Sequence, residues 1–488
     1  MKINIDRDDR KPVYLQISDA IEYMIKENRL VKGYKLPSER KLAAELDVHR
    51  NTVVKAYGEL VSKGLVLASR QQPRGYFVEA PAESPGFVQR FFPLEKAIQY
   101  DFNSAEKKFM DIFWESESRN CISFGGIVMD KKFDPICGMD DVLQQLFSRE
   151  EGGETAHLKK NICRILSRRN IYVKPKHIAV VAETNQALSY LMSLYVKAGD
   201  CIVAEEPMVP DNAGIFRNKG ICVITVPMEA DGMDMAALET AVKKHRPKFI
   251  YTIPNFHNPT GAVMSLEKRL RLLQIAEENN VPIIEEDYQR ELSYSEQEPP
   301  SLYVLDRNRS VVYVDSFNLT FPYGVKIGYV VGPTDLIEML GRVMEMDEAM
   351  LGSMGQYLFN AYVDRGFYDA HAQQMVSHYR RKRDLLCGEL DKIRDRGITC
   401  EKPEGGLLIW CRLEEGIGAR DLFEAARERG VLVMPGWVFY RQNGQDEEHI
   451  RLCFSNVSDD EICRGVRLLG DALDACRINN KEKEGTKL

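Results

Sequence analysis

The feature that most constrains the fold is an alternation of short apolar runs with amphipathic segments from residue 122 onward. The runs are rich in Val and Ile, and the segments between them carry apolar residues at helical spacing. Alternation of this kind predicts a largely parallel sheet with helices on both faces. The runs begin at His177, Cys201, Ile221, Phe249, Pro282 and Val311.

Further apolar segments predict a smaller α+β subdomain at about 370–475, next to a large subdomain at about 145–345. Together they form a predicted body at 118–475. The remaining residues, 476–488, form a charged tail that we expect to be disordered. The segments of the smaller subdomain, with helices around them, are 405–410, 431–434 and 450–454.

Composition is that of a globular protein, with 488 residues, 44% apolar and 28% charged, enough for two or three domains. No apolar run is long enough to span a bilayer, and the first residues do not resemble a signal peptide. The eleven cysteines contain no Cys-x-x-Cys pair, which favours reduced thiols in the cytoplasm over disulfides or a zinc site. Residues 1–80 carry a net charge of +4 against −11 for the remainder, which favours nucleic-acid contact at the N-terminus.

The first eighty residues predict three helices and a β-ribbon. We expect helices at 14–28, 39–46 and 50–63, with Ser38 as the N-cap of the second. Two strands, 65–69 and 75–79, follow around a basic turn. This order, mostly α with a β wing, predicts a winged helix-turn-helix at 1–79. Residues 80–117, rich in Pro and Ala at their start, predict a linker with some helix in it.

This N-terminal segment resembles the GntR family of DNA-binding domains. The resemblance rests on Leu36-Pro-Ser-Glu-Arg40, Val48-His-Arg-Asn-Thr-Val53, Ala56-Tyr57 and Arg74-Gly-Tyr-Phe-Val78, all at fixed spacing. It implies contacts with double-stranded operator DNA, and the start of a recognition helix is where side chains reach base edges. A solvated basic helix in a protein-interaction domain is the alternative. The implied DNA-contacting residues are Arg40, His49, Arg50, Asn51, Thr52, Arg70 and Arg74.

The body resembles fold-type I aminotransferases, enzymes that use pyridoxal phosphate (PLP), over about 120–475. Its markers are Thr184-x-x-Ala-Leu188, Pro254-Asn-Phe-His-Asn-Pro-Thr-Gly261, Glu285–Leu292 and Arg451-Leu-x-Phe-Ser. The expected fold is therefore an α/β PLP-transferase-like body with a smaller C-terminal α+β subdomain. A GntR-type head on such a body resembles the MocR subfamily of transcription regulators. That resemblance implies a homodimer that senses PLP or a PLP–amine adduct.

The resemblance assigns roles to residues of one site. Leu319 takes the position of the Schiff-base lysine and Lys326 that of the phosphate-binding arginine. Ser316 and Thr184 offer hydroxyl groups to a phosphate, and Arg451 matches the arginine that binds a substrate carboxylate. The remaining positions are those that face the cofactor ring: Asn258 and Tyr288 at the ring hydroxyl, and Glu286 at the pyridine nitrogen.

Several of these positions depart from the family pattern. Leu319 cannot form an imine, Glu183 replaces a glycine of the phosphate loop, and Val209 replaces the stacking aromatic residue. No tyrosine lies between Asp101 and Ile171, where the family tyrosine that reaches the phosphate is expected. Without the lysine there is neither an aldimine nor a base for the proton shift. We therefore expect covalent PLP binding and catalysis to be lost, while non-covalent PLP binding stays open.

Three hypotheses follow. The first is a dimeric cytoplasmic transcription regulator whose inactive aminotransferase-like body binds a small effector, with Arg451 and Lys326 favouring a carboxylate or phosphate group. The second is an active PLP enzyme with a DNA-binding appendage, against which Leu319 counts. The third is a body that serves only as a dimer scaffold, with Arg451 and Asn258 as inherited structural residues.

Overall fold

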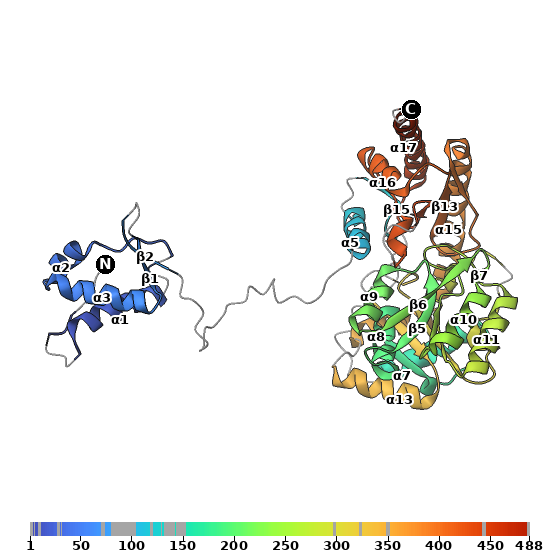
Figure 1. The fold of residues 1–488 in the computed structure, drawn as a ribbon. Coiled ribbons are helices and arrows are strands. Elements are labelled where there is room, and N and C mark those ends of the chain that lie inside the picture. Colours follow the sequence, from blue (N-terminus) through green and yellow to red (C-terminus); the bar gives the residue numbers. More distant parts are fainter. Residues whose placement is uncertain are drawn as a thin grey trace. The chain divides into compact units, whose positions relative to one another are not determined.

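The computed structural model contains two compact units, Met1–Gln99 and Tyr100–Leu488, each with its own hydrophobic core (Figure 1). We call them the head and the body. The structure describes the chain except residues 1–2, 4, 8–10, 27–29, 31, 70–73, 80–103, 118–120, 128, 131–141, 143–152, 296–298, 322–324, 348–351, 442–445 and 486–488.

The head consists of three helices and a two-stranded antiparallel ribbon, which agrees with the predicted winged helix-turn-helix (Figure 1). The ribbon pairs Val66 with Val78 and Ser69 with Gly75. The third helix buries side chains at i, i+3, i+4 and i+7 against the first, as an amphipathic helix requires. The elements are α1 (Val13–Lys26), α2 (Glu39–Leu46), α3 (Arg50–Ser62), β1 (Val66–Ser69) and β2 (Gly75–Val78).

Side-chain caps fix the turn between the second and third helices. Ser38 caps α2 by accepting a hydrogen bond from Lys41 N at 3.3 Å. Asp47 ends α2 in the left-handed conformation, and His49 then caps α3 through its Nδ1. These caps hold the two helices of the motif at a short, defined turn.

The body is built on an eight-stranded sheet in the order β4-β11-β10-β9-β8-β5-β6-β7. Strands β5, β6, β8, β9 and β10 pair in parallel, whereas β11 runs antiparallel to both of its neighbours. Most of these strands are buried on both faces, which explains their continuous Val- and Ile-rich sequences. The strands are β4 (Ile178–Val181), β5 (Cys201–Glu206), β6 (Cys222–Glu229), β7 (Gly232–Met233), β8 (Ile250–Thr252), β9 (Ile283–Glu286), β10 (Val311–Ser316) and β11 (Gly328–Val331).

Helices cover this sheet, as the alternating sequence pattern predicts (Figure 1). They are α7 (Glu154–Ser167), η2 (Pro175–His177), α8 (Thr184–Tyr195), α9 (Pro210–Asn218), α10 (Met235–His245), α11 (Leu266–Asn279), η3 (Arg290–Leu292), α12 (Leu302–Leu305), α13 (Thr334–Met346) and α14 (Ser353–Asp364).

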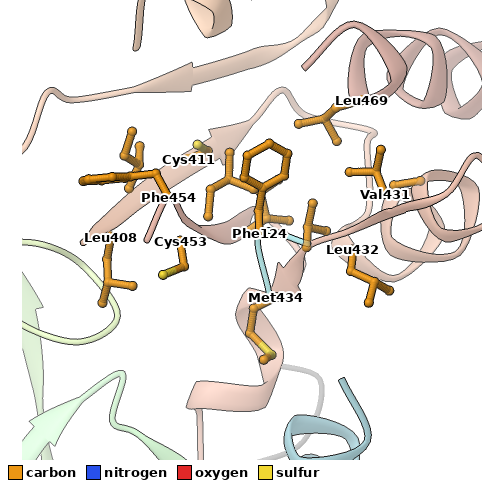
Figure 2. Packing of buried hydrophobic residues seen from close by; sticks show 14 of the residues in the cluster. Phe124, Leu408, Cys411, Val431, Leu432, Met434, Cys453, Phe454 and Leu469 are labelled. Atoms are coloured by element: carbon orange, nitrogen blue, oxygen red, sulfur yellow. The ribbon is translucent and has the colours of Figure 1, made fainter. Parts of the chain in front are cut away.

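The smaller subdomain has a four-stranded antiparallel sheet in the order β12-β13-β16-β15. Its core packs Leu408, Cys411 and Phe454 against residues of the flanking segments (Figure 2). Its elements are α15 (Phe367–Asp391), η4 (Arg394–Arg396), β12 (Ile398–Cys400), β13 (Leu408–Leu413), α16 (Ala419–Glu428), β14 (Val431–Leu432), β15 (Met434–Pro435), η5 (Gly436–Phe439), β16 (His449–Cys453) and α17 (Asp459–Gly485).

Two segments from the N-terminal side of the body join this smaller subdomain. Strand β3 (Ile122–Ser123) pairs in parallel with β14, and Phe124 enters the core (Figure 2). Helix α5 (Ser104–Glu117) buries Phe109 and Ile112 in the same core. The segment predicted as a linker therefore ends, among the described residues, in a helix that packs on the body.

The described part of the chain contains no helix that is long and apolar enough to cross a membrane. Its ten cysteines are free, and it holds no cluster of side chains suited to a metal ion. The predicted tail begins inside α17, whose described backbone continues to Gly485.

Candidate functional site

The first turn of α3 is the candidate DNA-contacting surface of the head. His49 Nδ1 accepts a hydrogen bond from Asn51 N at 3.2 Å, so the imidazole is engaged as a helix cap. Asn51 itself is exposed, and Thr52 is half-buried. Arg40 on α2 and Arg74 beside the wing are exposed, whereas predicted Arg70 lies outside the described residues.

Arg50 is held by a carboxylate of the preceding helix. Its Nε and Nη2 lie 3.0 and 2.6 Å from Glu39 Oε2, and Tyr76 donates to Glu39 Oε1 at 3.1 Å. The hydrogen bond from Arg50 lowers the pKa of Glu39. This contact ties α2, α3 and the wing strand β2 together. Arg50 is therefore braced within the head, which the sequence pattern alone did not reveal.

The candidate ligand site of the body is a cavity of about 480 Å³. It lies where the parallel strands end, since Glu286 closes β9, Ser316 closes β10 and Thr184 follows β4. The carboxyl edge of a parallel sheet is the usual ligand site of such folds. All the residues that the sequence assigns to the cofactor site line this cavity: Thr184, Asn258, Glu286, Tyr288, Ser316, Leu319, Lys326 and Arg451.

A hydrogen-bonded chain crosses one wall of this cavity. Arg451 Nη1 donates to Asn258 Oδ1 at 2.9 Å, and Asn258 Nδ2 donates to the Tyr288 hydroxyl at 3.0 Å. Arg451 Nη2 donates to Gly125 O at 2.6 Å. Residues from β16, from the loops after β8 and β9, and from the segment after β3 are thereby joined.

Arg451 keeps one buried donor without a partner. The side chain is 1% exposed, and Nε makes no hydrogen bond. The guanidinium lies 5.0 Å from the ring centre of Phe439 and 5.8 Å from that of Phe109. Burial lowers the pKa of Arg451. A buried cation that lines a cavity and keeps an unpaired N–H is suited to an anionic ligand group.

Glu286 is a second buried ionisable residue of the site. Its carboxylate accepts hydrogen bonds from the Tyr251 hydroxyl and, at 3.4 Å, from Asn212 Nδ2. Burial raises the pKa of Glu286, while hydrogen bonds from Thr184 and Tyr251 oppose that rise. The Thr184 hydroxyl is thus directed to Glu286. A carboxyl group with a raised pKa can accept or donate a hydrogen bond at this position.

The residues at the imine and phosphate positions differ from those of the family. Leu319 and Val209 are partly buried and pack against the apolar core of the smaller subdomain. Lys326 Nζ lies 2.6 Å from Glu183 Oε1. The cation at the phosphate position is therefore already paired with a carboxylate of the same chain.

Sequence reasoning missed one wall of the cavity. Phe109, Met110 and Phe113 of α5 line it, although their segment was assigned to the linker. Their helical spacing was visible, but nothing in the sequence indicated which surface they cover. Asp211, at the start of α9, was missed as well and brings a carboxylate to the lining.

Comparison with known proteins identifies both units. A family model described as aminotransferase class I and II matches residues 151–469, which is more than half of the chain. The chain belongs to the aminotransferase class I and II family. A second model, described as bacterial regulatory proteins of the gntR family, matches residues 13–78. The predicted fusion of a GntR-type head with an aminotransferase-like body is confirmed.

Relatives of this class I and II family member fall into two groups. The uncharacterized HTH-type transcriptional regulator YisV of Bacillus subtilis is 25% identical over 465 residues, covering 93% of this chain and 95% of YisV. The 2-aminoadipate transaminase of Thermus thermophilus is 31% identical over 306 residues, covering 62% of this chain and 77% of the transaminase. Of these two relatives, the regulator aligns along nearly the whole chain, as a MocR-type fusion does, whereas the transaminase aligns with less than two thirds of it.

A solved aminotransferase structure has the same body fold. Kynurenine aminotransferase of Pyrococcus horikoshii, in complex with PMP and substrates, superimposes with a TM-score of 0.71 and 26% identity. The match covers 80% of this chain and 98% of that enzyme. PLP is thus the cofactor of the family to which this body belongs.

The residues of this cavity do not fit the covalent, phosphate-anchored PLP of that family. The side chain at the imine position is apolar, and Val209 gives no aromatic face for the ring. At the phosphate position, Lys326 is neutralised by Glu183. Of the family contacts, the Asn258–Tyr288 pair and Arg451 keep matching chemistry.

Proposed function

We propose that this protein is a DNA-binding transcription regulator whose aminotransferase-like body is a ligand-sensing and dimerising module without catalytic activity. The observation that carries the proposal is Leu319, an apolar side chain in the cavity at the position that the resemblance gives to the Schiff-base lysine. The regulator YisV, which matches both units, supports a regulatory role.

The chemistry of the cavity favours this proposal over an active enzyme. Imine formation needs a neutral amine, and Leu319 has none. Among the described residues that line the cavity the one lysine is Lys326, whose ammonium is paired with Glu183. This lysine lies at the position that the resemblance gives to the phosphate-binding arginine, not at the imine position. The second hypothesis, an active PLP enzyme with a DNA-binding appendage, therefore lacks a suitable lysine here.

The proposal includes partners and boundaries that the sequence suggested. The winged helix-turn-helix at 1–79 binds double-stranded operator DNA through the start of α3, and the body forms a homodimer. Because α5 packs on the body, we place the end of the linker before Ser104. We expect the protein to act in the cytoplasm, where its DNA partner lies.

Borohydride trapping tests the loss of covalent chemistry. The full-length protein is incubated with pyridoxal and with PLP, reduced, digested and mapped by mass spectrometry. We expect no labelled lysine in the cavity of the native protein, because Leu319 cannot form an imine and Lys326 is paired. The variant Leu319→Lys should be labelled at residue 319, and Leu319→Met, which keeps an apolar side chain, should not. Labelling of the native protein at Lys326 would contradict the proposal.

We further propose that the effector carries a carboxylate, which the free Nε of buried Arg451 binds. Charge-assisted hydrogen bonds contribute about 1.5–3 kcal/mol each. Nη1 and Nη2 are already engaged with Asn258 and Gly125, so the arginine is held in place before the ligand arrives. A scaffold role alone gives no reason for an unpaired buried donor next to a cavity.

A thermal-shift screen tests the carboxylate. Monocarboxylic acids are compared with their own amides on the native protein and on Arg451→Gln. We expect an acid to stabilise the native protein more than its amide, and the variant to bind that acid about 10–150-fold more weakly. Arg412→Gln is the matched control, since Arg412 on neighbouring β13 is exposed and pairs only with Glu448 at 3.4 Å. Equal thermal shifts in both variants would contradict a carboxylate effector bound by Arg451. They would favour the third hypothesis, a dimer scaffold.

A further inference from the structure

The cavity contains an internal anion at the position that the resemblance gives to the cofactor phosphate. Glu183 Oε1 lies 2.6 Å from Lys326 Nζ, and both residues line the cavity. The family has a glycine at the first position and an arginine at the second. Here a carboxylate therefore stands where a phosphate oxygen would meet the cation.

The neighbouring hydrogen-bond donors are also engaged within the chain. Asn318, at the position of a family serine, donates to Ala182 O at 3.5 Å and accepts from Ile327 N at 3.1 Å. Ala182 N donates to Gln186 Oε1 at 2.7 Å. The Thr184 hydroxyl is engaged as well, since it is directed to Glu286.

The helix that follows stabilises the carboxylate. Glu183 is the N-cap residue of α8, but its side chain makes no capping hydrogen bond and reaches Lys326 instead. The positive end of the helix dipole lies at this position. A phosphate dianion would have to approach the Glu183 carboxylate, and like charges at short distance repel. The Glu183–Lys326 pair, whose side chains are 32% and 61% exposed, thus places a carboxylate beside the cation at this position.

The remainder of the cavity has a different character. Apolar side chains run along its lining from Phe113 on α5 through Val209 and Ile253 to Leu319, and the buried Arg451 shares the lining with the carboxyl groups of Glu286 and Asp211. Apolar surface beside a buried guanidinium suits a ligand with an apolar body and one anionic end.

We propose that the cavity binds a carboxylate with an apolar body and excludes phosphate esters, and that Glu183 sets this specificity. The inference rests on the proposed role of the cavity as a ligand sensor. In this respect the body differs from relatives that hold a phosphorylated cofactor, because here Glu183 of the same chain supplies the anion that pairs with Lys326.

Calorimetric titration of the full-length protein tests the inference. The probes are pyridoxine and pyridoxine 5′-phosphate, which differ only in the phosphate and form no imine. We expect the native protein to bind the ester no more tightly than the alcohol. Glu183→Gln should bind the ester on the order of tenfold more tightly than the native protein does, because Lys326 is released to pair with phosphate. In Glu183→Gln/Lys326→Gln this gain should disappear.

Each other outcome overturns the inference. Tighter binding of the ester by the native protein would show that the pair does not exclude phosphate. No gain in Glu183→Gln, including no binding by any variant, would show that Glu183 is not what excludes it. Since Glu183 makes no capping bond, its substitution removes no helix cap, and circular dichroism checks the fold. Failure here leaves the regulator proposal intact, because imine trapping and DNA binding are measured separately.

Discussion

Replacing Arg169 by methionine is expected to lower the free energy of unfolding of the body by about 3–5 kcal/mol, because buried carboxylates lose their cation. Arg169 follows α7 and donates from Nη1 to Asp315 Oδ2 at 2.7 Å and to the Tyr313 hydroxyl at 3.0 Å. Its Nη2 donates to Glu291. The side chain of Arg169 is 10% exposed and that of Asp315 is 2% exposed.

The loss of stability caused by Arg169→Met should grow as the pH rises. Burial raises the pKa of Asp315 from its ordinary value of 3.8 to about 6, although Arg169 opposes the rise. A raised folded-state pKa gives stability that is present below pH 3.8 and is lost as pH rises through 6. Without Arg169 the pKa of Asp315 rises further, so the loss continues to higher pH. We therefore expect a larger difference between variant and native protein at pH 8 than at pH 5.5.

Arg168→Met is the matched control. Arg168 is adjacent and also pairs with an aspartate, Asp369, but the two side chains are 47% and 43% exposed. Exposed pairs contribute about 0–1 kcal/mol. Urea unfolding followed by tryptophan fluorescence reports the body alone, since the three tryptophans, Trp114, Trp410 and Trp437, lie in it. Equal losses in both variants would contradict the prediction, and Asp315→Asn in the Arg169→Met background should recover part of the stability.

Substitution at the starts of α2 and α3 is expected to have the largest effect on DNA binding. We predict that Arg40→Ala and Asn51→Ala each weaken binding of the preferred operator by about 1–3 kcal/mol, or about 5–150-fold. Both side chains are exposed, and Asn51 lies in the first turn of the helix that His49 caps. The measurement is fluorescence anisotropy with a duplex selected from a random pool by the native protein, repeated between 50 and 200 mM salt.

Lys63→Ala controls for the loss of one positive charge. Lys63 follows the other end of α3, about 20 Å from its start at 1.5 Å per residue, and pairs with Glu22 at 2.7 Å. We expect its affinity to stay within about twofold of the native value, because a surface charge paired at this distance contributes little. Loss of affinity in Lys63→Ala equal to that in Asn51→Ala would indicate general electrostatic attraction. No loss of affinity in Arg40→Ala or in Asn51→Ala would place the DNA contact elsewhere.

Much of the ligand site could be predicted from the sequence because its residues follow strand ends. Parallel strands bring their carboxyl ends to one edge, so Thr184, Asn258 and Ser316 meet although they are far apart in the chain. Alternation along β9 sends neighbouring acids to different surroundings. Glu286 reaches the cavity, while Glu285 accepts hydrogen bonds from Leu302 N and Tyr303 N.

The partners of these residues could not be predicted, because they depend on long-range packing. Nothing in the spacing of Glu183 and Lys326, or of Glu39 and Arg50, shows that each pair forms an ion pair. The packing of α5 against the cavity could not be predicted for the same reason. Its apolar side indicated a helix, but the surface that it covers is built by residues about three hundred positions later.

Helix α5 has a thermodynamic consequence for the whole body. It is the first described element after the head, and Phe109 on it contacts both the cavity and the Arg451 guanidinium. It is held by ion pairs of Glu106 with Arg217 at 2.6 Å and of Glu115 with Arg427 at 2.9 Å. If a bound ligand strengthens the docking of α5 on the body by some factor, then the docking of α5 raises the affinity for that ligand by the same factor. In that case, a pulling force on the chain before Ser104, or a partner that competes for α5, would change the ligand affinity.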